Sequence, residues 1–274
     1  MNNIEHIYKQ IDSKRSILYS WFNAMNTRID VVLCDRTEDD LKYIIRLIYD
    51  KIKSIEKIGN YFDPESEISI VNKAALYVSI SISPELYMII SEALYYNKLT
   101  YGYFDVTIHS ENYSENSISH IMLEKDKSAI YFTQDGLRID LSGFLKGYAL
   151  DKVLSILNEH KIINALLNVG NSSVMALGNH PFGEGWKIGF EDYRGSAMIH
   201  LKDQCLTTSG NNCRERKHIV NPYNNSFIEG TKQISVITQN GIEGEVLSTT
   251  LFAAPEVERG NIMKNFKATI QNTN

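Results

Sequence analysis

The chain has 274 residues, of which 43% are hydrophobic and 22% charged, and this composition is typical of globular proteins that can bury a sizeable core. The formal net charge of -5 argues against general binding to nucleic acid, because such binding depends on basic side chains that contact phosphates. The sequence shows neither a signal-peptide pattern nor a run of about 18 apolar residues, and its three cysteines have no metal-ligand spacing. For the chain as given, we expect a cytoplasmic protein with no integral membrane segment and no nucleic-acid partner.

The first third of the chain predicts one strand and two helices. After a polar, amphipathic start, residues 29–33 alternate in the manner of a strand. Thr37 is a natural N-cap for a long helix that ends at Gly59. A turn-rich loop over residues 60–66 follows, and Ser83 and Pro84 start the next helix. The residues of the long helix that recur at helical spacing are assigned to the core: Leu41, Ile44, Ile45, Ile48, Ile52 and Ile55.

The rest of the chain predicts a hairpin, a polar turn, a helix and then mostly strands. Asp135-Gly136 is a strong hairpin signal between two short strands. In the segment from Asp140 to Asp151, an acid and two small residues lead into an amphipathic helix; such a turn can hold an anion or simply cap the helix. A helix around residues 243–252 and a strand around residues 266–270 close the chain. The other predicted strands cover residues 165–169, 174–177, 186–190, 197–201 and 233–238.

This order of elements predicts an α+β fold of mixed sheets with flanking helices, in two intimately packed halves, and excludes a regular βαβ alternation. No internal repeat, low-complexity tract or flexible linker marks a boundary. We therefore expect residues 1–274 to form a single domain.

Five short blocks follow one another along the chain. They are Ala24-Met25-Asn26-Thr27, residues 63–69 with Asn72, Gly102-Tyr103-Phe104-Asp105-Val106-Thr107, residues 140–148, and a stretch that runs from Thr208-Ser209-Gly210 through His218-Ile219-Val220-Asn221-Pro222 to Leu247-Ser248-Thr249. Together they resemble the ApbE family of FAD:protein FMN transferases over roughly residues 20–270. Agreement of several motifs in one order is far more specific than any single motif.

The resemblance implies an enzyme that binds FAD with Mg²⁺, transfers FMN to a Ser or Thr hydroxyl of an acceptor flavoprotein, and releases AMP. It implies three metal ligands: the backbone of Gly143, the carboxylate of Glu245 and the hydroxyl of Thr249. Glu245 and Thr249 are four residues apart, so a helix places both oxygens on one face. The implied flavin contacts are Met25, Phe62, Tyr103, Phe104, Asp105, Asp140 and Lys146, with Ile219 nearby.

The resemblance also implies a catalytic role for Asp140 and Lys146, with His218 as the candidate general base or proton relay. The other six histidines, including His109 and His120, are assigned to the surface. Without the resemblance, the same residue types fit blander roles. These are a solvent-facing Glu245, a Thr249 bonded to its own backbone, a turn cap at Asp105, and core or lid aromatics at Phe62 and Phe104.

The chain departs from the family pattern in segments that face the flavin and the metal. Asn26 stands where the family has a glycine, although Asn is the least penalised replacement in the left-handed region. Glu245 stands where the family has Asp, which shifts the carboxylate by roughly 1.5 Å, and Mg²⁺ tolerates distorted geometry poorly. Two alternatives therefore stay open: a divergent flavin-binding protein without turnover, and an FAD pyrophosphatase that uses water as the acceptor.

Overall fold

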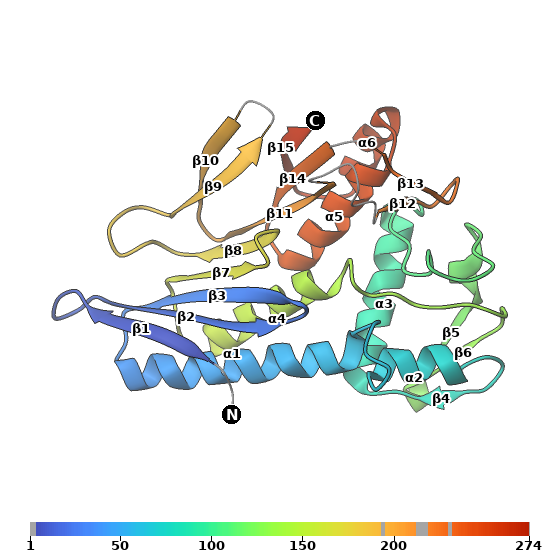
Figure 1. Ribbon diagram of the computed structural model, residues 1–274, viewed down its shortest axis with the longest axis horizontal. Coiled ribbons are helices and arrows are strands. Elements are labelled where there is room, and N and C mark those ends of the chain that lie inside the picture. The colour runs from blue at the N-terminus through green and yellow to red at the C-terminus, as the bar shows by residue number, and fades with distance from the viewer. Residues whose placement is uncertain (1–3, 193–194, 212–218, 230–231, 274) are drawn as a thin grey trace.

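The computed structural model describes residues 4–192, 195–211, 219–229 and 232–273. Eight strands form the main sheet: β1 (Glu5–Gln10), β2 (Ser16–Ala24), β3 (Thr27–Cys34), β7 (Ala165–Val169), β8 (Ser173–Leu177), β11 (Gln204–Asn211), β14 (Lys232–Thr238) and β15 (Thr269–Thr273). Their order in the sheet is β1-β2-β3-β7-β8-β11-β14-β15, and all neighbours are antiparallel. Strands from both ends of the chain thus share one sheet (Figure 1).

Three helices cover one face of the main sheet: α1 (Glu38–Gly59), α4 (Leu145–Glu159) and α5 (Gly241–Ala253). Thr37 caps α1 as predicted, because its hydroxyl accepts the N–H of Asp40 at 3.3 Å. The six apolar residues of α1 assigned to the core are all buried. They pack with buried residues of β2, β3, β7 and α4 in one hydrophobic cluster. The opposite face of the sheet is partly covered by a hairpin of β9 (Trp186–Asp192) and β10 (Gly195–Leu201), whose Trp186 and Leu201 are buried.

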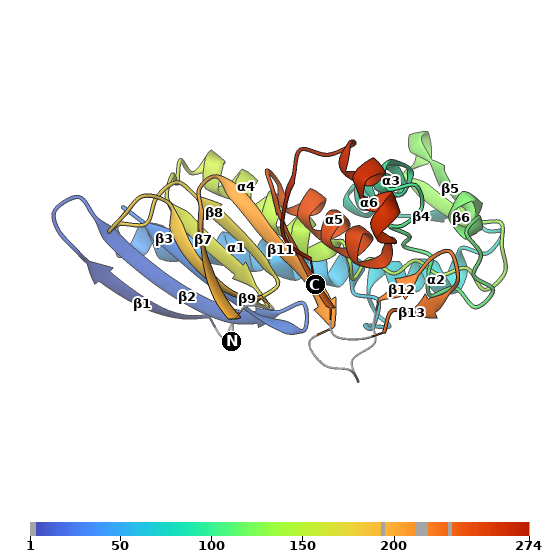
Figure 2. The same ribbon diagram turned by 90° about the horizontal axis from the view of Figure 1, so that it is seen from above.

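The remaining elements lie beyond the end of the main sheet, where α1 extends past the strands (Figures 1 and 2). They include α2 (Glu67–Ala74), α3 (Pro84–Leu99) and a small sheet of β4 (Ile80–Ser81), β6 (Ala129–Phe132) and β5 (Ile121–Glu124). The short pair β12 (Val220–Asn221) and β13 (Ser226–Phe227) and the helix α6 (Glu256–Met263) complete the molecule. Within the described ranges, no helix is long and apolar enough to cross a membrane.

The predicted α+β class is confirmed, and so are the helices over α1, α3, α4 and α5. The prediction of a hairpin at Asp135-Gly136 is wrong. The hairpin is formed by β5 and β6, which are joined through residues 125–128, and Asp135-Gly136 makes a turn after β6. In the part of the chain that the structure describes, the next element after that turn is α4, and the backbone of Ile139 is bonded by the side chain of Asn72. Asn72 accepts the N–H of Ile139 at 2.8 Å and donates to its carbonyl at 2.9 Å.

Several elements were not expected from the sequence. The polar start forms β1 and β2. Nearly all residues of β1 are exposed, so its sequence lacks the alternation of apolar and polar residues that predicts a strand. Helices α2 and α6 and strand β11 were also missed, and the last strand begins at Thr269, later than predicted. The chain after residue 164 consists mostly of strands, as predicted, and the main sheet also includes β1, β2 and β3 from the start of the chain.

Candidate active site

Helices α4 and α5 cross in backbone contact at two glycines. A Cβ at Gly147 would lie 2.3 Å from the carbonyl oxygen of Gly241, and a Cβ at Gly241 would lie 2.6 Å from the carbonyl oxygen of Gly147. No side chain fits at such distances, so glycine is required by close approach. Lys146 directly precedes Gly147, and Glu245 follows Gly241 by one helical turn. The crossing therefore brings these two charged residues together.

Asp151 holds the start of α5 against α4. Its Oδ1 accepts the N–H of Gly241 at 2.6 Å and its Oδ2 accepts the N–H of Ile242 at 3.1 Å. A carboxylate at this place satisfies donors that a helix leaves free and interacts favourably with the helix dipole. Burial raises the pKa of Asp151 to about 6, although the two backbone hydrogen bonds oppose the rise. The position of α5, and with it that of Glu245, thus depends on the Asp151 carboxylate, whose ionised form is disfavoured by burial.

A connected polar cluster surrounds Glu245. Lys146 Nζ donates to Ser172 Oγ at 2.5 Å and to Ser173 Oγ at 3.2 Å, and it lies 3.4 Å from Glu245 Oε1. The hydroxyl of Ser173 also donates to Glu245. The side chain of Glu245 is only 4% exposed, so the alternative of a solvent-facing glutamate is wrong. Its charge is met by Lys146, as a buried carboxylate requires.

Thr249 lies one turn beyond Glu245 on the same helix. Ser209, at the end of β11, donates to Ser248 Oγ at 2.9 Å and lies 3.3 Å from Thr249 Oγ1. The carboxylate and hydroxyl oxygens along this face are hard donors of the kind that Mg²⁺ prefers. In the part of the chain that the structure describes, no three His, Cys, Asp or Glu residues form a metal-holding group. Besides Glu245, a cation here would therefore depend on Thr249, on backbone oxygens and on oxygens of a ligand.

Asp140 lies in a second polar group, built from loops. Its backbone N–H donates to Val106 O at 2.7 Å, which pairs its segment with the loop that follows Asp105. His109 Nδ1 lies 2.8 Å from Asp140 Oδ2, and the N–H of Ser142 donates to Asp140 Oδ1 at 2.8 Å. Sequence reasoning placed His109 at the surface and missed this bond. Its position two residues after the block that ends at Thr107 was the available signal.

The predicted flavin contacts near Asp140 have different surroundings. Phe62 is 71% exposed, whereas Phe104 is 4% exposed and packs against Phe144 with ring centroids 6.1 Å apart. Asp105 accepts the N–H and hydroxyl of Thr107, so it caps a turn, and burial raises its pKa. For Phe104 and Asp105 the blander roles are thus present in the structure, and a role in flavin binding stays a prediction.

The other predicted residues come from three separate segments of the chain. Met25 and Asn26 form the tight turn between β2 and β3, both with left-handed backbone (φ 53° and 56°), as expected for Asn26. The ring of Tyr103 lies 4.7 Å from that of Tyr223. Ile219 is 8% exposed and belongs to an apolar cluster with residues of α5. His218 lies outside the described residues.

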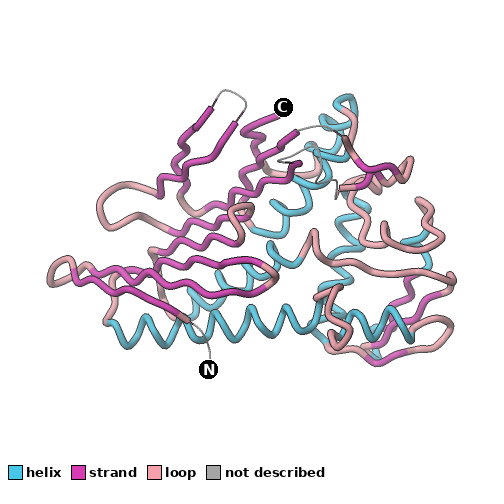
Figure 3. Tube along the Cα trace, viewed as in Figure 1, coloured by secondary structure: helices cyan, strands magenta, loops and turns pink. Residues whose placement is uncertain are grey.

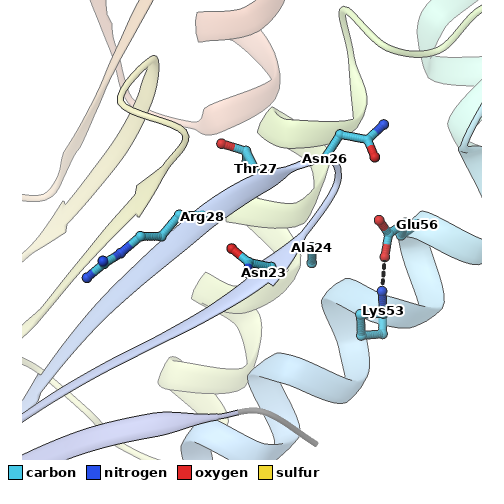
Figure 4. A pocket seen from close by; sticks show the side chains of 7 residues that line it. All are labelled: Asn23, Ala24, Asn26, Thr27, Arg28, Lys53 and Glu56. Carbon is cyan, nitrogen blue, oxygen red and sulfur yellow. Dashed lines mark hydrogen bonds and ion pairs between the residues drawn. The ribbon is translucent and has the colours of Figure 1, made fainter.

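Two pockets are open at the surface. One, of about 340 Å³, lies between the β2–β3 turn and α1, where Figure 4 shows Lys53 paired with Glu56 on the helix. The other, of about 990 Å³, lies between the β9–β10 hairpin and the outer face of the sheet, with Ile17, Val32 and Leu166 in its lining. The described residues that line these two pockets do not include Lys146, Glu245 or Asp140.

Comparison with known proteins places the chain in a family. A sequence model of the ApbE family matches residues 25–271. The FAD:protein FMN transferase of Chlamydia muridarum is 26% identical over 229 residues, which cover 72% of this chain and 71% of the relative. The FAD:protein FMN transferase of Buchnera aphidicola subsp. Schizaphis graminum is 26% identical over 262 residues, which cover 82% of this chain and 74% of the relative.

Solved structures share the fold. The flavin transferase ApbE from Vibrio cholerae superposes with a TM-score of 0.78 at 18% identity, covering 98% of this chain and 93% of that chain. The ApbE protein from Thermotoga maritima gives a TM-score of 0.77 at 22% identity, covering 92% of this chain and 93% of that chain. With a family match that extends over nearly the whole chain, this protein belongs to the ApbE family.

Proposed function

We propose that this chain is an FAD:protein FMN transferase that works with Mg²⁺. The hydroxyl oxygen of a Ser or Thr in an acceptor flavoprotein attacks the phosphorus on the FMN side of the FAD pyrophosphate. The bond from that phosphorus to the bridging oxygen breaks, AMP leaves with the bridging oxygen, and the hydroxyl proton passes to a base. Such a transfer asks a protein mainly for positioning and charge neutralisation.

The observation that carries this proposal is the cluster at the α4–α5 crossing. Lys146 and Glu245 lie 3.4 Å apart, and Thr249 follows Glu245 by one turn on the same face. An ammonium group, a carboxylate and hydroxyls at one place can serve both phosphate oxygens and a cation. The start of α4 offers further donors to a phosphate. Among the described residues, its N-cap residue, Phe144, makes no side-chain hydrogen bond that caps the helix. The N–H of Leu145 donates to Leu141 O at 3.1 Å, so the later N–H groups of the first turn are the ones that can serve an anion.

The donor set fits a magnesium ion. Glu245, Thr249 and the backbone of Gly143 would hold Mg²⁺, which when bound supplies positive charge to the phosphate oxygens. Lys146 binds a phosphate oxygen from the side of α4. Asp140 accepts a hydrogen bond from a donor group of the nucleotide, and Phe62 offers its exposed ring to an aromatic system. His218 accepts the hydroxyl proton, a role that rests on the family resemblance.

The direct test is incubation of the pure protein with FAD, Mg²⁺ and an acceptor flavoprotein fragment that carries a target Thr. We expect a fluorescent covalent flavin band and one AMP for each acceptor modified, and neither product in EDTA. An acceptor whose target Thr is replaced by Val is the matched control. Absence of both products at every Mg²⁺ concentration overturns the proposal.

Two other outcomes identify the alternatives. Release of AMP without an acceptor indicates an FAD pyrophosphatase. Tight FAD binding with no AMP indicates a flavin-binding protein without turnover, which the replacement of the family's Asp by Glu245 keeps as the second candidate. Oε1 of Glu245 is already engaged by Ser173 and Lys146, and this engagement competes with a metal for that oxygen.

A further inference from the structure

Two hydrogen bonds hold the Asp140 carboxylate, one at each of its oxygens. Oδ2 is bound by His109 Nδ1 at 2.8 Å and Oδ1 by the N–H of Ser142 at 2.8 Å. A carboxylate has about four lone-pair sites, so each oxygen still has one for a ligand. Asp140 is thus held in one orientation and keeps its capacity to accept a further hydrogen bond.

The two partners differ sharply in exposure. The side chain of Asp140 is 8% exposed and that of His109 41%, so the pair differs from a surface ion pair, whose members are both solvated. Burial alone would raise the pKa of Asp140, but the hydrogen bonds from His109 and Ser142 outweigh burial and hold its pKa below the usual value. The bond to Asp140 in turn raises the pKa of His109. The buried carboxylate therefore stays ionised at neutral pH.

Three loops meet at His109. The backbone N–H of Asp140 donates to Val106 O, and the N–H of Arg138 donates to Ser110 Oγ at 2.9 Å. These bonds join the segment that carries His109 to the segment that carries Asp140. The ring of Tyr61 lies 6.1 Å from the imidazole. These loops carry Phe62, Phe104 with Asp105, and Asp140, which the proposed function assigns to the flavin nucleotide. His109 lies on the second of these loops, and its side chain contacts Asp140 and Tyr61 on the other two.

We propose that His109 is a positioning residue of the nucleotide site: through Nδ1 it holds the Asp140 carboxylate in one orientation, so that Asp140 accepts a hydrogen bond from a hydroxyl or amino group of FAD. This inference rests on the proposed function, because it takes FAD as the ligand. The role requires Nδ1 alone. Nε2 has no hydrogen-bond partner among the described residues and is left to water.

Amide substitutions separate the two ring nitrogens. His109→Asn places an N–H donor near the position of Nδ1, His109→Gln places one near Nε2, and His109→Ala removes both. The measurements are the dissociation constant for FAD, and kcat and KM for transfer. We expect His109→Ala and His109→Gln to weaken FAD binding about tenfold, the usual effect of losing a hydrogen bond to a charged group. His109→Asn should stay within about threefold of the wild type, and kcat should change little in all three.

A matched control is His120→Ala. His120 is another partly exposed histidine whose Nδ1 bonds a side chain, Thr133 Oγ1, at 2.8 Å. It lies beside the small sheet, and its loss should leave FAD affinity unchanged. Thermal unfolding of His120→Ala and His109→Asn should match the wild type closely, whereas His109→Ala and His109→Gln lose a hydrogen bond to the buried Asp140 carboxylate and should be slightly less stable.

Three results overturn the inference. FAD affinity unchanged in His109→Ala removes any role in binding. Lost kcat with retained affinity in His109→Asn assigns the function to Nε2 and to proton transfer. A histidine pKa, followed by NMR, that is the same in the wild type and in Asp140→Asn shows that the pair does not form in solution. A wild-type protein that binds no FAD but shows the raised histidine pKa overturns the proposed function itself, so the two failures are distinguishable.

Discussion

The two parts of the candidate site are built in contrasting ways. The Lys146–Glu245 part lies where α4 and α5 touch through glycines, and Glu245 is buried between a helix and the sheet. The Asp140 part is assembled from three loops on the side of the molecule where loops dominate (Figure 3), and it leaves Phe62 71% exposed. In the proposed function, the helical part holds the charges that act on the pyrophosphate and the cation, and the loop part holds the residues assigned to the flavin nucleotide. Substitutions in the helical part should therefore cost both stability and rate, and substitutions in the loops should cost mainly affinity.

The largest effect is expected at the helix crossing. Gly147→Ala adds a Cβ that would lie 2.3 Å from the carbonyl oxygen of Gly241, so α4 and α5 must move apart. Such overpacking costs about 1–3 kcal/mol or more of unfolding free energy and displaces Lys146 from Glu245. We expect a lowered midpoint of thermal unfolding together with nearly complete loss of transfer, measured by calorimetry and by covalent flavin fluorescence.

Gly260→Ala in α6 is the control for this substitution. A Cβ at Gly260 meets no atom of the described residues within 4 Å, so alanine there should leave activity unchanged and favour the helix slightly. A Gly147→Ala protein with full activity would show that the close crossing is not needed to place the charges.

The sequence predicted the helix that carries Glu245 and Thr249, because helical spacing is a local property. Glu245 and Thr249 are four residues apart, so their shared face followed once a helix was expected around them. The loop part was beyond prediction from the sequence alone. His109 and Asp140 are 31 residues apart, and their bond exists only because the segments around Val106 and Asp140 pair through the backbone.

The failed hairpin teaches a related point. Asp135-Gly136 does form a turn, with Gly136 at φ +69°, so the local signal was interpreted correctly. A turn signal does not say whether a partner strand is present on its far side. Here Asn72, from α2, satisfies the backbone of Ile139 in place of a strand. Asn72 and Ile139 are 67 residues apart in the chain, so no pattern in residues 130–140 could reveal these bonds.

The second effect in size concerns the reach of Glu245. Because the longer side chain already bonds Ser173 and lies beside Lys146, we expect Glu245→Asp to lose these contacts and slow transfer about tenfold. Glu245→Gln, which removes the charge, should slow transfer on the order of 100-fold and raise the Mg²⁺ concentration needed for half-maximal rate. The measurement is the initial rate against Mg²⁺ concentration. A faster Glu245→Asp enzyme would contradict the view that the site is adapted to glutamate.

A smaller effect is expected from the pH dependence of stability. The folded pKa of Asp151 is about 6 and its unfolded pKa is close to 3.8, so the folded state binds the proton more tightly. The stability from this group is complete below pH 3.8 and is lost as the pH rises through 6. Between pH 7 and pH 5 the wild type should therefore gain about 1 kcal/mol relative to Asp151→Asn, measured by urea unfolding at both values. Equal pH dependence of the two proteins would show that Asp151 is not buried as an ionised cap.

The smallest effect tests the loop part alone. Phe62→Ala removes an aromatic ring that is 71% exposed, so the free energy of unfolding should change by less than about 0.5 kcal/mol. If the ring stacks on the flavin nucleotide, KM for FAD should rise several-fold while kcat stays close to the wild-type value. Phe182→Ala is the matched control, because Phe182 is 66% exposed in the lining of the pocket beside the β9–β10 hairpin, and its loss should leave KM unchanged. A fall in kcat at unchanged KM would instead assign Phe62 to the chemical step and would remove the division between a helical part that sets the rate and a loop part that sets affinity.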